Sequence, residues 1–294
     1  MSDTAETKNH QAGYGVFGSY EMFRDLGPQK WREIEALGYI GLWAGGPPPA
    51  DLSWVDPILA ATDTLHVGTG IVNIWTADAT EVARSYHRIA DAYPGRFVLG
   101  IGAGHPEAIS AYRKPYDALN DYLDELDRQG VPRERRVLAA LGPRVLKLSA
   151  DRTGGALPYL TTPQHTADAR ELIGPDAGLA PEHKVIMTTD VEQARALGRD
   201  ALAVYLPLAN YRATWTRLGF TEADMDAPGS DALVDAMIAY GTTEQIAARL
   251  NEHITAGANH VAIQVLTEPE GLVPALTALA GPLGLTTPAD TPTV

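Results

Sequence analysis

Residues 65–107 read LHVGTGIVNIWTADATEVARSYHRIADAYPGRFVLGIGAGHPE, and this stretch decides the fold. It begins with a short apolar run at 66–71 and ends with another at 97–101, both typical of buried strands. Between them Asp78 stands as an N-cap with Glu81 three residues later, the pattern of a capping box that opens a helix. A proline-glycine pair then breaks the helix. The stretch therefore predicts the strand-helix-strand unit of a parallel sheet.

The same alternation continues along the chain. Further strands are predicted at residues 14–18, 39–43, 136–141, 155–160, 184–187 and 260–266. Helices are predicted from residues 28, 55, 115, 143, 162, 190 and 242, with an irregular or helical stretch at 207–219 and a last helix ending near 280. Eight short strands in a chain of this length favour a closed barrel over an open sheet. We predict a single α/β domain, a (β/α)8 TIM barrel over residues 13–284, with flexible ends at 1–12 and 285–294.

The composition is that of a globular protein, with 45% hydrophobic and 20% charged residues. Cysteine is absent, which excludes disulfides, thiolate metal ligands and a cysteine nucleophile. The polar first residues lack the apolar core of a signal peptide, and no apolar run is long enough to span a membrane. A net charge of −14 argues against nucleic acid and anionic lipid as partners. We expect a cytoplasmic protein that acts on a small molecule.

Two blocks carry a family resemblance. Residues 65–107 contain a GTGI strand end, a helix ARSYHRIADAYPGRF and the run VLGIGAGHPE. Residues 135–171 read RRVLAALGPRVLKLSADRTGGALPYLTTPQHTADARE. Both blocks resemble the luciferase-like monooxygenase superfamily, in its branch of actinobacterial oxidoreductases that use the deazaflavin coenzyme F-420 (8-hydroxy-5-deazaflavin).

The resemblance implies a bacterial luciferase-like barrel that transfers a hydride between coenzyme F-420 and an unidentified small organic substrate. It also implies a homodimer. One alternative is an FMN-dependent monooxygenase that acts on paired donors with molecular oxygen. A second alternative is a non-catalytic relative that binds the cofactor.

The site of such a barrel lies at the C-terminal ends of its strands. Many residues there are small, which lets the backbone approach the faces of a flat tricyclic ring. The residues expected to bind the cofactor are Gly18, Ser19, Gly70, Ile71, Asn73, Gly102, Ala103, Gly104, Leu141, Gly142, Arg144 and Thr161. Those expected to line the substrate pocket are Trp43, Trp75 and Tyr159, although Trp43 is also explained by core packing.

Two of these positions have a specific expected role. The family has a non-prolyl cis peptide bond or a bulge behind the ring, so the resemblance implies a cis bond between Gly70 and Ile71. A plain glycine at a strand end is the alternative. Asn73 is expected either to hydrogen-bond the pyrimidine-like edge of the ring or to form an Asn-type turn.

The segment from Leu141 to Arg144 joins a strand to a helix, and free N–H groups at a helix N-terminus form an anion site. The family places the cofactor phosphate near this point. Arg144 either adds charge there or is solvated. Thr161 is a further candidate, whereas Thr162 is expected to be a simple N-cap.

His105 is the candidate catalytic residue, because an imidazole at this strand end can polarise a carbonyl or relay a proton. A structural role is the alternative. Deazaflavin dehydrogenases of the family carry an Asp-His pair after the second strand, but residues 44–49 read AGGPPP here. The loop therefore offers no acid or base, which puts sugar-phosphate oxidation in doubt.

Two other enzyme classes fit less well. A nicotinamide enzyme needs Gly-x-Gly-x-x-Gly after a strand, and GIGAGH at 100–105 lacks the third glycine. A metal-dependent hydrolase needs clustered His and carboxylate ligands, whereas the histidines here are scattered. We therefore expect no metal site.

Overall fold

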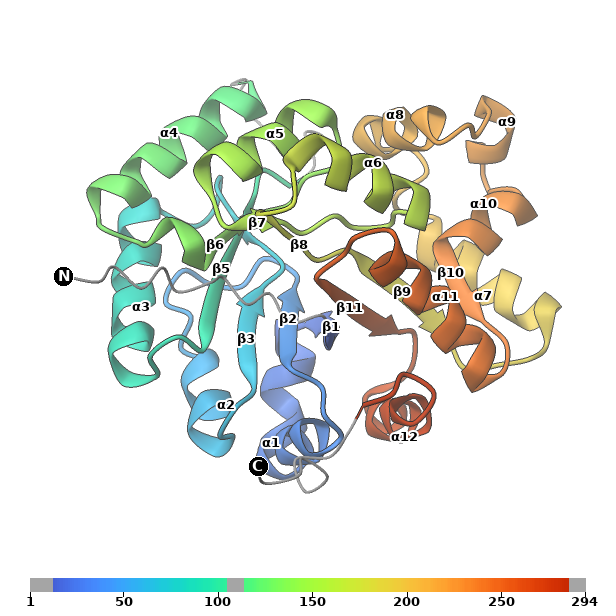
Figure 1. The fold of residues 1–294 in the computed structure, drawn as a ribbon, viewed down its shortest axis with the longest axis horizontal. Coiled ribbons are helices and arrows are strands. Elements are labelled where there is room, and N and C mark those ends of the chain that lie inside the picture. Colours follow the sequence, from blue (N-terminus) through green and yellow to red (C-terminus); the bar gives the residue numbers. More distant parts are fainter. Residues whose placement is uncertain (1–12, 105–113, 286–294) are drawn as a thin grey trace.

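The computed structural model describes residues 13–104 and 114–285. Its strands gather in the middle, with helices around them (Figure 1). All the strand pairs run parallel, as right-handed strand-helix-strand crossovers produce. The strands are β1 (Gly13–Ser19), β2 (Gly41–Gly45), β3 (His66–Thr69), β4 (Val72–Asn73), β5 (Phe97–Gly102), β6 (Arg136–Leu138), β7 (Gly155–Ala156), β8 (Gly178–Leu179), β9 (Glu182–Ile186), β10 (Ile238–Tyr240) and β11 (His260–Val265).

The helices begin where local signals place them. Asp78 accepts hydrogen bonds from the N–H groups of Thr80 and Glu81, and Thr242 forms a full capping box with Gln245. The helices are α1 (Tyr20–Ala36), α2 (Val55–Ala61), α3 (Ala79–Ala92), α4 (Pro115–Arg128), α5 (Pro143–Arg152), α6 (Pro163–Ile173), α7 (Val191–Leu202), α8 (Ala209–Arg217), α9 (Glu222–Met225), α10 (Asp231–Met237), α11 (Thr243–Thr255) and α12 (Pro269–Ala280), with a 3-10 turn η2 (Arg133–Arg135).

One extended segment, residues 178–186, closes the sheet into a barrel. Its first part, β8, pairs with β7, and its second part, β9, pairs with β11, which in turn pairs with β1. Between the two parts, the N–H of Ala180 donates to the carbonyl of Ala156 on one side. The N–H of Ala262 donates to the carbonyl of Pro181 on the other side, and the N···O distance is 2.9 Å in both bonds. The strands β1, β2, β3–β4, β5, β6, β7, β8–β9 and β11 thus form the predicted (β/α)8 barrel.

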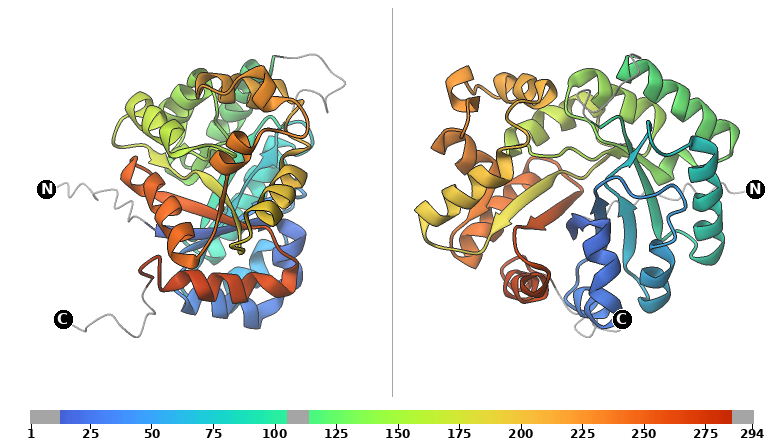
Figure 2. Two further views of the ribbon diagram at one scale, coloured as in Figure 1. Left: turned by 90° about the vertical axis from the view of Figure 1, so that its right-hand side faces the viewer. Right: turned by 180° about the vertical axis from the view of Figure 1, so that it is seen from behind.

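The chain departs from the prediction between α7 and α11. The sequence predicts only an irregular or helical stretch at 207–219, but the structure has α8, α9, α10 and the extra strand β10, which pairs with β9. These elements are too short to show a clear period, and β10 follows α10 without a break. The helices α8 to α10 gather at one corner of the molecule (Figure 1, Figure 2).

The first helix also differs from its prediction. It begins at Tyr20, capped by the Ser19 hydroxyl, rather than at Pro28. Gly27 has φ 80° and ψ 167°, which interrupts the helix. Pro28 therefore opens the second stretch of α1, where its missing N–H costs nothing.

Alternate residues of each strand face the helices and the barrel axis. Val16, which pairs with Ile263 and Leu42, is fully buried on the helix side. On the inner side Gly68 makes room for Trp43, because a Cβ there would lie 2.5 Å from the indole ring. The indole Nε1 of Trp43 donates to Nε2 of His260 at 2.8 Å. Trp43 is thus part of the packing inside the barrel.

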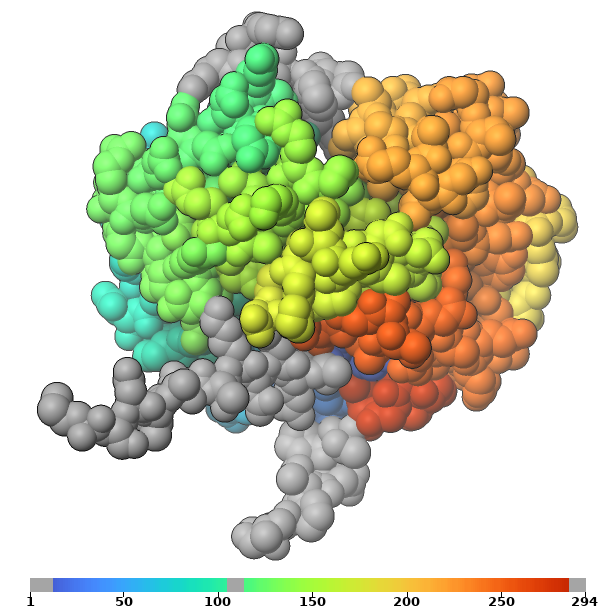
Figure 3. Space-filling model, turned by 45° about the horizontal axis from the view of Figure 1, so that its top comes forward, coloured from blue at the N-terminus to red at the C-terminus, as the bar shows by residue number. Residues whose placement is uncertain are grey.

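A histidine pair fixes two outer helices to the barrel wall. Nε2 of His253 on α11 lies 3.0 Å from Nδ1 of His183 on β9, and Nδ1 of His253 lies 2.8 Å from the hydroxyl of Thr166 on α6. In the space-filling view, α6 lies between α5 and α11 (Figure 3). Burial lowers the pKa of His253 to about 3 and that of His183 well below its usual range.

We expect the free energy of unfolding to fall as the pH is lowered from about 6.5 toward about 4. In this range His253 binds a proton in the unfolded chain but not in the folded protein. The free energy of unfolding therefore falls by about 1.4 kcal/mol for each pH unit. The contribution of His253 to the free energy of unfolding is therefore fully present above about pH 6.5 and is lost on acidification. Urea unfolding of the wild type and His253→Gln at several pH values tests this. The variant should lose stability less steeply, and equal slopes would contradict the assignment.

Gly100 is required where β5 lies beside the end of β3. A Cβ there would lie 1.8 Å from the carbonyl oxygen of Thr69, whose hydroxyl also bonds both backbone groups of Gly100. Gly100→Ala should therefore cost about 3 kcal/mol or more in urea unfolding. Gly281→Ala is the control, because its Cβ meets open space. A Gly100→Ala protein as stable as the control would show that the strands separate easily.

Candidate functional site

A cavity of about 560 Å³ opens at the C-terminal ends of the barrel strands. Phe17 from β1, Gly45 from β2 and Leu157 after β7 form part of its wall. Tyr116 from α4 and Asn210 from α8 complete it from the helix side. No Asp, Glu, Lys, Arg or His side chain is among the described residues that line it, so the wall is apolar with a few hydroxyl and amide groups.

The structure brings together eight of the residues predicted for the site. They are Gly70, Ile71, Asn73, Ala103, Gly104, Leu141, Gly142 and Tyr159, all of which line the cavity. The peptide bond between Gly70 and Ile71 is cis, which confirms that prediction. Oδ1 of Asn73 accepts the N–H of Trp75 at 3.0 Å, so the Asn-type turn is present.

Seven described residues predicted for the site do not line the cavity: Gly18, Ser19, Gly102, Arg144, Trp43, Trp75 and Thr161. Gly18 faces α1, and Ser19 is the N-cap of that helix. A Cβ on Gly102 would lie 2.9 Å from Ile71, so this glycine lies behind a residue of the wall. The indole N–H of Trp75 donates to the carbonyl of Ala103 at 2.7 Å.

The remaining predicted residues divide as follows. Thr161 is fully buried with no hydrogen-bond partner for its hydroxyl, while Thr162 is the N-cap of α6, as predicted. Arg144 is exposed at the rim, with its guanidinium 4.3 Å from the ring centre of Tyr116. His105 lies outside the described residues.

Sequence reasoning missed a charged pair at the wall of the cavity. Glu182 and Lys184 are two residues apart on β9 and both point into the barrel, where they are almost completely buried. Oε1 of Glu182 lies 3.2 Å from Nζ of Lys184. The available signal was a pair of charged residues with strand spacing in an otherwise buried strand, but the predicted strand began at residue 184.

The ammonium of Lys184 satisfies all three of its donors. It donates to the hydroxyl of Tyr159 at 2.6 Å, to Oε1 of Gln264 at 2.6 Å, and to Glu182. The second carboxylate oxygen of Glu182 accepts the N–H of Leu160 at 3.1 Å. Leu160 adopts φ 52°, a conformation rare for a branched residue, and such outliers cluster at functional sites.

Burial and charge act against each other in this pair. Burial raises the pKa of the Glu182 carboxyl and lowers the pKa of the Lys184 ammonium, while their mutual attraction opposes both shifts. Full hydrogen bonding of both groups favours the ionised pair. Burial also raises the pKa of Tyr159 well above its usual range, so its hydroxyl is protonated at neutral pH.

We expect Lys184→Met to lower the free energy of unfolding by about 3–5 kcal/mol, because Glu182 is left buried without a counter-ion. The double variant Glu182→Gln/Lys184→Met removes both charges with similar side-chain volumes. Its stability should return to within about 1 kcal/mol of the wild type. Urea unfolding at pH 7 measures both. A single variant as stable as the double variant would mean that water reaches Glu182.

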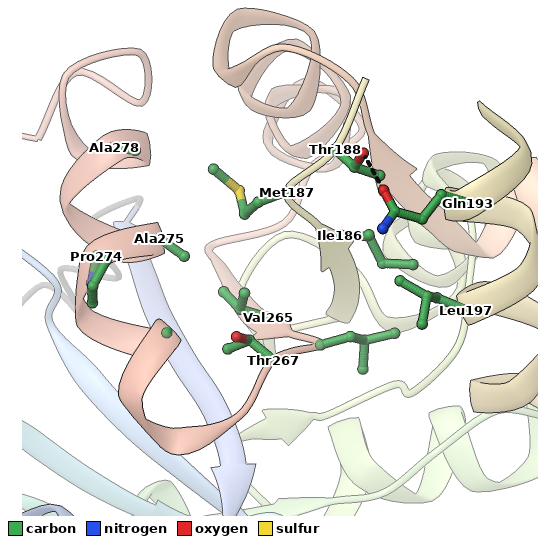
Figure 4. Close-up of a pocket in the computed structure, with 12 residues that line it drawn as sticks. Ile186, Met187, Thr188, Gln193, Leu197, Val265, Thr267, Pro274, Ala275 and Ala278 are labelled. Carbon is green, nitrogen blue, oxygen red and sulfur yellow. Dashed lines mark hydrogen bonds between the residues drawn. The ribbon is translucent and has the colours of Figure 1, made fainter. Parts of the chain in front are cut away.

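Two further hollows lie outside the barrel ends. One lies between α7 and α12, where Leu197, Pro274 and Ala278 line a groove with Thr188 and Gln193 at one side (Figure 4). The other lies beside α5, α6 and α8. The described residues contain no group of three or more His, Asp or Glu side chains placed to hold a metal ion. Within the same residues, no helix combines the length and apolar character needed to cross a membrane.

Comparisons with known proteins agree with this architecture. Residues 28–129 match the family model of luciferase-like monooxygenases. Among curated proteins, none matches the chain in sequence.

Solved structures resemble the chain over most of its length. An F-420-dependent secondary alcohol dehydrogenase, in complex with an F-420-acetone adduct, has 14% identity and a TM-score of 0.73 over 93% of this chain and 99% of its own. The coenzyme F-420-dependent tetrahydromethanopterin reductase from Methanopyrus kandleri has 12% identity and a TM-score of 0.63, over 92% and 97%.

A third structure is that of an oxygenase. The oxygenating constituent of 3,6-diketocamphane monooxygenase from Pseudomonas putida, in complex with FMN, has 12% identity and a TM-score of 0.68, over 96% and 100%. Identities this low extend the likeness to the fold alone. The chain therefore has the luciferase-like (β/α)8 barrel fold, and its residues 28–129 match the model of the luciferase-like monooxygenase family.

Proposed function

We propose that this chain is an oxidoreductase that binds coenzyme F-420 in the cavity at the strand ends and transfers a hydride between it and a small organic substrate. The observation that carries this proposal is the cavity itself. It lies where barrel enzymes have their sites, holds about 560 Å³, and has an apolar wall with no charged side chain among its described residues. A flat, largely apolar ring and a small substrate fit such a wall.

The residues present fit the cofactor at two points. Ile71 and Leu157 offer apolar contacts to a ring. At the N-terminus of α5 no described side chain caps the backbone, and a Cβ on Gly142 would be 3.8 Å from its nearest described neighbour. Pro143 has no N–H, and the N–H groups of Val145 and Leu146 donate to the carbonyl of Gly142. The N–H of Arg144 is therefore the group in this first turn that is left for a phosphate, which a helix N-terminus attracts.

A bound deazaflavin supplies the hydride donor or acceptor. The chain binds and orients it: the strand ends hold the ring, and the start of α5 holds the phosphate. Phe17, Leu157 and Tyr211 line the same cavity and offer apolar surface to a substrate.

FMN is the second candidate, because the same open helix N-terminus fits a phosphate monoester. An FMN protein of this fold would oxygenate its substrate rather than transfer a hydride reversibly. The fold accommodates both, since one similar structure is an FMN complex and another holds an F-420 adduct.

Binding of either cofactor should raise the melting temperature, since a ligand at about 100 times its Kd stabilises the native state by about 2.7 kcal/mol. Ala139→Phe should abolish the shift, because Ala139 lines the cavity and a phenyl group there occupies the ring's space. The matched control is Ala278→Phe in the groove of Figure 4, which should keep the wild-type shift.

The choice of cofactor follows from the same titration. A shift with F-420 alone supports the proposal, and a shift with FMN alone supports the oxygenase. No shift with either at concentrations well above micromolar would overturn the oxidoreductase function.

A further inference from the structure

The cavity offers few groups that can move a proton. Among the described residues that line it, the ionisable side chains are Tyr116, Tyr159, Tyr205 and Tyr211. Hydride transfer to or from a carbonyl compound requires one proton at the substrate oxygen, so a donor must be found among the groups that reach the cavity.

Tyr159 differs from the other three tyrosines because a buried ammonium donates to it. Nζ of Lys184 lies 2.6 Å from the Tyr159 hydroxyl and 4.3 Å from the centre of its ring. Since Lys184 donates, the phenol oxygen accepts, and the proton of Tyr159 points away from Lys184. The O–H of Tyr159 donates to Oε1 of Gln264 at 3.0 Å, and the hydroxyl of Tyr205, at 3.1 Å, is the second partner to which it can turn, since either oxygen can donate in that contact.

Tyr205 continues this row of hydroxyl groups into the cavity. It lines the cavity, and its hydroxyl is less deeply buried than that of Tyr159. Burial raises the pKa of both phenols, so each carries its proton at neutral pH. A protonated phenol is a donor for an oxygen that gains negative charge.

Asn210 adds an acceptor to the same wall. Its Oδ1 is buried yet has no hydrogen-bond partner among the described residues, which is costly unless a ligand supplies a donor. The cavity thus has a hydroxyl donor at Tyr205 and an unused amide at Asn210. A substrate hydroxyl can accept from Tyr205 and donate to Asn210, whereas a carbonyl oxygen can accept from Tyr205.

We propose that Lys184, Tyr159 and Tyr205 form a proton relay that ends on a carbonyl or alcohol oxygen of the bound substrate. Tyr205 is the catalytic residue, and Tyr159 and Lys184 are positioning residues that act through it. Gln264 and Glu182 hold Lys184 in place. The inference rests on the proposed function and assigns its substrate class.

The proton balance is complete. In the reducing direction a carbonyl carbon receives the hydride from the reduced flavin or deazaflavin, and the carbon–oxygen π bond breaks. The substrate oxygen takes the proton from the O–H of Tyr205, Tyr205 takes the proton of Tyr159, and Tyr159 takes one from Lys184. The neutral lysine then regains a proton from solvent through the same row after product release. Alcohol oxidation runs in reverse.

The first test measures single-turnover oxidation of reduced F-420 or FMN by a panel of simple ketones and aldehydes. Tyr205→Phe should lower the rate by about a hundredfold, the usual contribution of a general acid, while the cofactor Kd stays within about threefold. Tyr159→Phe and Glu182→Gln/Lys184→Met should each lower it by about tenfold or more and change its pH profile. Tyr240→Phe is the control, because Tyr240 bonds Asp235 outside the cavity, and its rate should match the wild type.

The second test needs no substrate. Tyrosines are labelled with carbon-13 at Cζ, and their resonances are followed by NMR from about pH 6 to about pH 11. Glu182→Gln leaves the ammonium uncompensated and should lower the pKa of Tyr159 and Tyr205 together. Relative to Glu182→Gln, the double variant Glu182→Gln/Lys184→Met should raise both pKa values again, because the ammonium is gone as well, with Tyr240 unchanged. Packing alone gives no such paired reversal.

The outcomes separate the two proposals. Wild-type protein that binds neither cofactor overturns the proposed function. Wild-type protein that binds a cofactor, together with a Tyr205→Phe variant that reacts at the wild-type rate, overturns the relay alone. If no compound in the panel reacts, the NMR titration decides. A Tyr205 pKa that is the same in the wild type and in both variants overturns the relay, and a shift of the Tyr159 and Tyr205 pKa values together supports it.

Discussion

The structure depends on residues 178–186 being hydrogen-bonded along both edges. This one segment joins β7 to β11 and so turns an open row of parallel strands into a barrel. Closure removes the exposed sheet edges and creates an interior, and the strand period of two then decides what enters it. Glu182 and Lys184 face inward, whereas His183 between them faces α11. The same backbone constraint therefore closes the fold and places an ion pair inside it.

An ion pair in this position is expensive, and its cost limits the explanations for it. Removing two charges from water costs several kcal/mol for each ion, and apolar residues of the same volume often stabilise a protein more. Here the pair lies against the wall of a cavity whose described lining carries no charge. Its hydrogen bond to the described lining of that cavity goes to the hydroxyl of Tyr159. A role in positioning that hydroxyl explains why the charges lie there, which a packing role does not.

The local patterns predicted most of the fold and about half of the site. Each predicted strand exists because a short apolar run is buried on both faces in a parallel barrel. The strand ends with small residues, such as Gly70 and Ala103, line the cavity as expected. The position of a large side chain along the barrel axis was not predictable from the sequence, because it depends on how far each strand is shifted relative to its neighbours. Trp43 faces inward but lies beside His260, below the cavity, and Trp75 turns back onto Ala103.

The residues that the sequence did not indicate come from segments without a clear period. Tyr205 lies between α7 and α8 and Asn210 lies in the first turn of α8, and only tertiary packing brings them to the strand ends.

The positions of Tyr205 and Asn210 bear on how the loop after β2, which has no charged side chain, is interpreted. That loop contributes Gly46 and Pro47 to the wall, next to Gly45 at the end of β2, so it shapes the cavity without any acid or base. Among the described residues, acid–base groups then have to come from another part of the wall. The β7–β9 side supplies it in a buried form, as a tyrosine hydroxyl with an ammonium behind it. A buried donor of high pKa suits an oxygen that becomes strongly basic during the reaction, and is a poor partner for one that is already an anion. The site is therefore suited to neutral carbonyl and alcohol groups, which agrees with an apolar wall and with the strongly negative charge of the chain.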